Sequence, residues 1–149
     1  MASFVEKGID DLMLSFEEIA ELPEQVVLEM LVAQGEVLQE AQKKKIRQLG
    51  LVDTEQLAES IKINKKLRGK KFGEQFITVY PKGTRETTGN TGATTKTTNN
   101  EVGFINEFGA PNRSIKPTQW MRQANEESAE EGLNASERVY DRFLKSKGF

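Results

Sequence analysis

The side chains able to do chemistry in this chain of 149 residues are carboxylates, hydroxyls and amines, because the chain contains neither histidine nor cysteine. Histidine is the commonest general base and metal ligand, and cysteine supplies thiolates for catalysis, metal binding and disulfides. A serine or threonine hydroxyl therefore has no imidazole to activate it, and no Ser-x-x-Lys spacing offers a lysine instead. We accordingly expect a protein that is not an enzyme and that holds no metal and no cofactor.

Adjacent glutamates occur at positions 17–18, 126–127 and 130–131. Two carboxylates can serve as general acid and base when both face one substrate. All three pairs lie in segments with helical periodicity, where neighbouring side chains point in different directions, so we interpret them as solvated faces. The glycines between positions 83 and 92 lack the strand-to-helix context that a phosphate-binding loop requires.

Basic residues form the clearest functional pattern. The net charge is only −2, yet residues 1–40 hold ten acids and one base, whereas residues 41–85 hold twelve bases and four acids. Such segregation is typical of a surface that binds nucleic acid or the oppositely charged face of another subunit, and two solvated helix faces would produce it as well. The candidate residues for a subunit interface or a DNA-lined lumen are Lys43, Lys44, Lys45, Arg47, Lys65, Lys66, Arg68, Lys70 and Lys71.

Long helices must position the first of these residues. Apolar residues at spacings of three and four predict an amphipathic helix over 9–21, and Pro23 then begins a second helix that runs to about Leu49. Gly35, in the middle of that helix, indicates a bend or a close packing contact, and Gly50 provides the stop. A last helix begins near Pro117, with an apolar stripe that is expected to place its tryptophan in the core.

Between the long helices the periodicity becomes that of strands. A capping box at Asp53 predicts a short helix, and alternating residues predict strands over 60–66 and 74–80. The segment 101–109 is expected to return to the sheet as a further strand. We therefore predict a single α+β domain over 1–149, with long N-terminal and C-terminal helices packed on a small, mainly antiparallel β-sheet.

The segment 82–100 consists of threonine, glycine, asparagine and a few charged residues. A stretch of this length and composition does not bury enough apolar surface to order itself, so a long, flexible Thr/Gly-rich loop is expected. Two interpretations remain open: an arm that orders on contact with another subunit, and a hairpin tip without a function.

Three short elements together resemble the gene-product-ten-like family of phage neck and tail-completion proteins. The first reads Thr-Glu-Gln-Leu-Ala-Glu-Ser-Ile at 54–61, the second Glu-Phe-Gly-Ala at 107–110, and the third is the Pro- and Trp-containing segment 115–124. Glu55 stands where the family usually has glycine. The residues that match the family motifs are Thr54, Leu57, Ser60, Ile61, Glu107, Phe108, Gly109, Pro117 and Trp120.

The resemblance implies a structural protein of the virion at the head-tail junction of a long-tailed bacteriophage, assembled in the cytoplasm of the host bacterium. Its expected partners are copies of itself in a ring of six, the head-closure or connector protein, and the tail terminator or tail tube protein. Genomic DNA would pass through the lumen of such a ring. A ring of identical subunits requires heterologous contacts, and the acidic N-terminal segment and basic middle segment are a candidate pair.

Two other functions are compatible with the sequence. A small nucleic-acid-binding module would account for the basic residues, and an intracellular adaptor of unrelated origin would account for the charge segregation. No apolar run approaches the ~20 residues that a membrane-spanning helix needs, so no membrane partner is expected.

Overall fold

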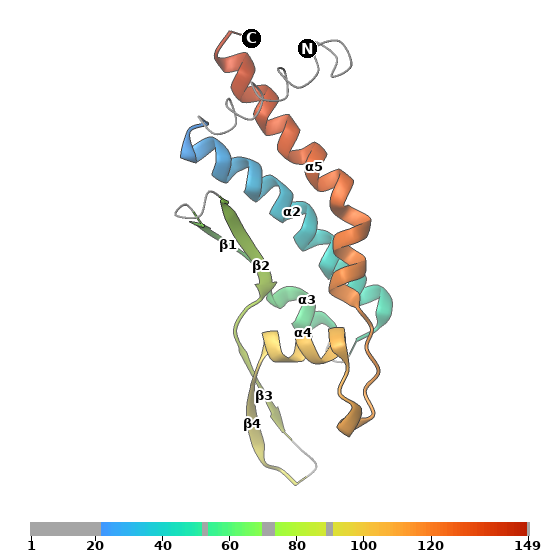
Figure 1. The fold of residues 1–149 in the computed structure, drawn as a ribbon. Coiled ribbons are helices and arrows are strands. Elements are labelled where there is room, and N and C mark those ends of the chain that lie inside the picture. Colours follow the sequence, from blue (N-terminus) through green and yellow to red (C-terminus); the bar gives the residue numbers. More distant parts are fainter. Residues whose placement is uncertain (1–21, 52–53, 70–73, 89–90, 149) are drawn as a thin grey trace.

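The computed structural model describes residues 22–51, 54–69, 74–88 and 91–148. Two long helices lie side by side at one end of the molecule, and a β-hairpin projects from the other end (Figure 1). The fold class is α+β, as predicted. The strands of the described residues form two separate antiparallel sheets of two strands each. The predicted helix over 9–21 and the cap at Asp53 lie outside the described residues.

The two long helices are α2 (Glu24–Leu49) and α5 (Trp120–Ser146), and both were predicted. Two hydrogen bonds show that they run antiparallel: Gln34 Nε2 donates to Ser136 Oγ at 3.1 Å, and Gln42 Nε2 donates to Asn125 Oδ1 at 2.9 Å. Gly50 ends α2 in the left-handed conformation at φ 58°, as its place in the sequence predicts.

The first sheet consists of β1 (Ile61–Arg68) and β2 (Phe76–Pro81), and α2 lies between this sheet and α5 (Figure 1). Gly35 lies at the packing contact between helix and sheet. A Cβ atom at this position would lie 3.5 Å from side-chain atoms of Ile63, Ile77 and Val79. The sequence-based expectation of close packing at Gly35 is thus confirmed.

The core lies where α3 (Thr54–Ser60), β1 and the start of α5 meet the end of α2. Trp120 is its largest fully buried side chain, with a relative exposure of 0%. The fully or nearly fully buried apolar residues of this cluster are Ile46, Leu51, Leu57, Ala58, Ile61 and Trp120. The prediction that Trp120 belongs to the core is confirmed.

The segment 82–100 has more regular structure than the predicted loop. Its strands β3 (Thr84–Thr88) and β4 (Thr94–Thr98) pair in register from Thr84↔Thr98 to Thr88↔Thr94. Threonine is β-branched and favours strands, which explains pairing in a segment without an apolar face. Arg85 anchors the base of the hairpin, because its buried Nε donates to Asn99 Oδ1 at 2.8 Å.

The segment 101–109 was expected to be a strand and is instead helical. Helix α4 covers Asn99–Phe108, and the Thr98 hydroxyl caps it by accepting a hydrogen bond from the backbone N–H of Glu101 at 3.0 Å. The expectation was wrong because the apolar residues here do not mark a sheet face. Gly103 and Asn106 point into the protein, while Phe104 and Phe108 point out of it.

Among the described helices, none combines the length and apolar content needed to cross a bilayer.

Candidate subunit interface

Glu107, from the second motif, joins α4 to α5. Its carboxylate is buried and accepts hydrogen bonds from two backbone N–H groups of the first turn of α5: Met121 N at 2.7 Å and Arg122 N at 3.2 Å. These N–H groups have no partner within their own helix, and the positive end of the helix dipole favours the carboxylate. Glu107 therefore fixes the start of α5 relative to α4. We call the region where Gly103, Glu107, Gly109 and Trp120 meet the joint.

Gly109 and Trp120 complete this joint. Gly109 has φ 79°, and a Cβ atom there would lie 2.8 Å from the Ile115 carbonyl oxygen and 2.8 Å from the Pro117 nitrogen, so a larger residue does not fit. The buried indole Nε1 of Trp120 donates to the Gly103 carbonyl at 2.9 Å. The chain reversal between α4 and α5 thus depends on the residues of the second and third motifs.

The residues of the first motif lie in α3 and at the start of β1, in contact with the same core. Leu57 and Ile61 are fully buried. The hydroxyl of Thr54 donates to the Leu51 carbonyl, and the hydroxyl of Ser60 donates to the Leu57 carbonyl at 2.6 Å. These side chains have structural roles inside the chain, so they do not themselves form a surface site.

Phe108 is the motif residue without such a role. It is 63% exposed, and its ring packs against the ring of Phe104, which is 61% exposed, with the ring centroids 4.7 Å apart and tilted by 50°. Glu101, one turn earlier, is exposed as well. Residues at spacings of three and four share one side of a helix, so these three side chains form one surface, which we call the α4 face.

Most basic residues of α2 have acidic neighbours in the same chain. The Nζ atom of Lys45 lies 2.9 Å from a carboxylate oxygen of Glu127, and Arg47 Nε lies 2.9 Å from Glu55 Oε1. The hydrogen bond to Glu55 and its negative charge raise the pKa of Arg47 above its ordinary value. Lys43 Nζ lies 3.9 Å from Glu40 Oε1, and Lys44 is exposed. The charge of this group is therefore partly balanced within the chain.

The basic residues of β1 are placed differently. Lys65, Lys66 and Arg68 are exposed, whereas Lys70 and Lys71 lie outside the described residues. Because Ile63 packs beside Gly35 and the Gln39 amide donates to the Ile61 carbonyl at 2.7 Å, β1 runs back along α2 towards its start. The structure therefore separates the basic residues of β1 from those at the end of α2.

A groove of about 1110 Å³ lies between α2 and α5. Small apolar residues, among them Val37, Ala41 and Val139, line it together with side chains of both charges, so it has no dominant sign. In the described part of the chain, no group of three or more acidic residues is arranged to hold a metal ion.

The chain matches no protein-family model, no curated protein and no solved structure. Its surfaces are therefore interpreted from their own geometry.

Two surface features went unnoticed in the sequence. Phe104 was assigned to a strand, although its spacing of four from Phe108 fits a helix, and Thr98 followed three residues later by Glu101 has the form of a capping box. The second feature is the outer side of the first sheet, where Arg68 is paired with Phe76. That pairing depends on an irregularity between Asn64 and Arg68, for which the sequence carries no evident signal.

Proposed function

We propose that this chain is a structural virion protein of the head-tail junction of a long-tailed bacteriophage, where copies of it form a ring between the head connector and the tail. The main support is the joint around Trp120. Three motifs that are far apart in the sequence contribute to one packed unit, in which Leu57 and Trp120 both lie against Gly103. Residues that define a fold are expected to meet in this way, so the joint supports the resemblance from which the proposal starts.

The surfaces of the subunit suit a role in assembly. The α2–α5 pair with its joint provides a scaffold, from which the β3–β4 hairpin projects with most of its side chains exposed (Figure 1). A hairpin of two strands is marginally stable in water unless it packs against something else. Within a ring, the hairpin would gain such a partner from an adjoining subunit or ring, and Lys44, Lys65, Lys66 and Arg68 would face a neighbour or the DNA.

Deleting the reading frame from the viral genome that encodes it tests the proposal. We expect lysates in which DNA-filled heads and finished tails accumulate separately, visible by negative-stain electron microscopy, because the ring that joins them is missing. The wild-type gene supplied from a plasmid should restore joined particles. Complete, infectious virions formed without the protein would contradict the proposal.

A nucleic-acid-binding module is the second candidate, and one observation favours it. Phe76 and Tyr80 lie on the same side of the first sheet as Lys62 and Arg68, because residues paired across two antiparallel strands share a side. Aromatic rings for base stacking and basic residues for phosphates are what single-strand binders combine. Titration of a fluorescent single-stranded oligonucleotide at several salt concentrations separates the two candidates, since phosphate contacts give steep salt dependence.

A further inference from the structure

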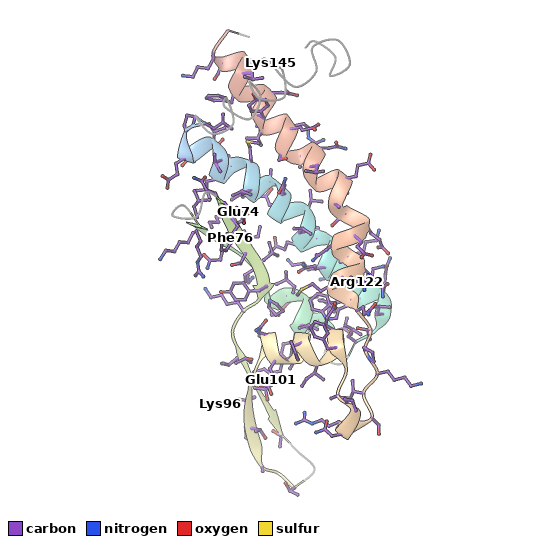
Figure 2. The ribbon with its side chains drawn as sticks, viewed as in Figure 1. Glu74, Phe76, Lys96, Glu101, Arg122 and Lys145 are labelled. Atoms are coloured by element: carbon purple, nitrogen blue, oxygen red, sulfur yellow. The ribbon has the colours of Figure 1, made fainter. Side chains whose placement is uncertain are left out.

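We infer that the α4 face of one copy, formed by Glu101, Phe104 and Phe108, docks against the outer side of the first sheet of a second copy. This sheet face consists of Lys62, Asn64, Arg68, Phe76, Thr78 and Tyr80. The inference rests on the proposed function and specifies which two surfaces meet in the ring. Figure 2 labels Glu101 on α4 and Phe76 on β2.

The register of the strands defines the sheet face. Lys62 is paired with Tyr80, Asn64 with Thr78 and Arg68 with Phe76, so these six side chains share one side. The opposite side, with Ile63 and Val79, packs on α2 at Gly35. In the described structure α4 of the same chain borders the sheet face at Asn100, whereas Phe76, near the start of β2, is 46% exposed.

A hollow makes the sheet face suitable for a helix. It has a volume of about 490 Å³. Its lining comes from β1 and β2, with one residue from α4 of the same chain: Asn64, Arg68, Ile77, Thr78, Val79, Tyr80 and Asn100. A helix that presents aromatic side chains at spacings of three and four inserts them into such a hollow, which is a common mode of recognition between proteins. The α4 face has the matching convex form, because Phe104 and Phe108 project side by side from one helix.

Charge and ring chemistry also match. The sheet face carries Lys62 and Arg68 with no acidic residue among its six side chains, whereas the α4 face carries Glu101 with no basic one. An arginine guanidinium also stacks favourably on an aromatic ring, so Arg68 has both a charged and an aromatic counterpart on the α4 face. The negative Glu101 and the positive Lys62 and Arg68 attract each other only when the α4 face meets the sheet face. Like charges therefore disfavour a contact between two α4 faces or between two sheet faces.

The contact joins two different surfaces, so every copy donates one and receives one. Contacts of this heterologous kind generate closed rings when the rotation between neighbours closes, whereas self-complementary contacts produce dimers. An aromatic side chain buries about 150–250 Å² and a stable interface needs about 800 Å² on each partner, so these rings supply only part of one contact. We therefore expect self-association that depends on protein concentration and is strengthened when the ring closes.

Charge reversal on each surface, alone and together, tests the inference on the full chain by sedimentation velocity. Arg68→Glu and Glu101→Arg should each weaken self-association at least about tenfold, because each places like charges opposite one another. The double variant should regain most of the loss, since both contacts of every copy then carry the exchanged pair. Phe104→Ser with Phe108→Ser should weaken association without rescue by either charge change.

Leu133→Ser is the matched control, because Leu133 is similarly exposed, at 58%, and lies on α5 away from both surfaces. It should leave self-association unchanged. Urea denaturation identifies any variant whose fold is damaged, and the double charge variant keeps the test valid if a single variant folds poorly.

Three outcomes would overturn the inference. The first is that both single charge variants form the same ring as the wild-type protein, and the proposed function would then survive. Another is a closed dimer that depends on both surfaces, since that would be a self-complementary contact. The third is oligonucleotide binding that Arg68→Glu abolishes while self-association stays at the wild-type level. Absence of the protein from purified virions would instead refute the proposed function itself.

Discussion

The joint around Trp120 and the β3–β4 hairpin are held together by different interactions. In the joint, buried apolar side chains surround Trp120, and the buried Glu107 satisfies backbone donors of α5. In the hairpin, backbone pairing connects strands whose described side chains are mostly exposed, apart from the anchor Arg85. Burial of apolar surface is the dominant favourable contribution to folding, so the joint stabilises the fold, whereas the hairpin leaves most of its side chains exposed.

The largest expected effect is that of removing the centre of the joint. Trp120→Ala should lower the free energy of unfolding by about 3–5 kcal/mol, because a large cavity replaces a fully buried ring and Gly103 loses its indole donor. Urea denaturation followed by circular dichroism measures this loss. Phe108→Ala is the control, and its effect should stay within about 0.5 kcal/mol because that ring is exposed. Equal losses in both variants would contradict the assignment of core and surface.

Removing the carboxylate at the joint should have the second largest effect. Glu107→Ala leaves the partly buried N–H groups of Met121 and Arg122 without their acceptor, which should cost about 1–3 kcal/mol. Glu107→Gln keeps one acceptor oxygen, so it should recover part of the loss. Chemical denaturation of the three proteins under one set of conditions gives the order. A Gln variant less stable than the Ala variant would argue against capping as the role of Glu107.

Two helical glycines should respond in opposite directions. At Gly103 a Cβ atom would lie 3.1 Å from Pro81 Cγ and 3.3 Å from Trp120 Cζ2, so Gly103→Ala introduces an overpacking cost of about 1–3 kcal/mol. That cost exceeds the gain of about 1 kcal/mol in helix propensity, and the net result should be destabilising. At Gly35 the nearest atoms are at 3.5 Å, an ordinary contact, so Gly35→Ala should stabilise by up to about 1 kcal/mol. Thermal unfolding distinguishes the two signs.

Shortening the hairpin should have the smallest effect on stability. Replacing residues 87–95 by an Asn-Gly turn connects the paired residues Glu86 and Lys96 through a two-residue loop and keeps the anchor at Arg85. The unfolding free energy should change by less than about 0.5 kcal/mol, because few buried contacts are lost. Asn99→Ala, which removes the acceptor of the buried Arg85 Nε, is the contrasting variant and should destabilise measurably. A large loss on shortening would mean that the hairpin belongs to the core.

The long helices and the first sheet could be predicted from the sequence. In these segments the periodicity of the apolar residues agrees with the positions of the residues that begin and end the elements. Pro23, Gly50 and the stripe that includes Trp120 mark elements whose apolar residues face inward, and the structure places them so. The helix α4 was missed because two of its aromatic residues face outward, which reverses the usual meaning of an apolar pattern. A hairpin tip was one of the two interpretations of the segment 82–100, but its two strands were not predicted. They lack an apolar face, so only the strand preference of threonine indicates them.

The candidate surfaces were less predictable than the fold. The exposure of Lys65, Lys66 and Arg68 followed from their charge, but the pairing of Arg68 with Phe76 depends on an irregular register between the strands. The partial balance of the α2 bases by Glu55 and Glu127 depends on the packing of α3 and α5. Both are tertiary effects, so composition alone did not distinguish these two groups of basic residues.

The antiparallel arrangement of α2 and α5 has a practical consequence. It places the C-terminal end of α5 at the extremity of the molecule farthest from the hairpin, with α4 near the hairpin (Figure 1). An affinity tag appended after α5 would hold the molecule by the end remote from α4, which carries the exposed rings of Phe104 and Phe108. Immobilised in that orientation, the protein would present those rings and the hairpin to whatever flows past, so capture experiments could be done on an undisturbed surface.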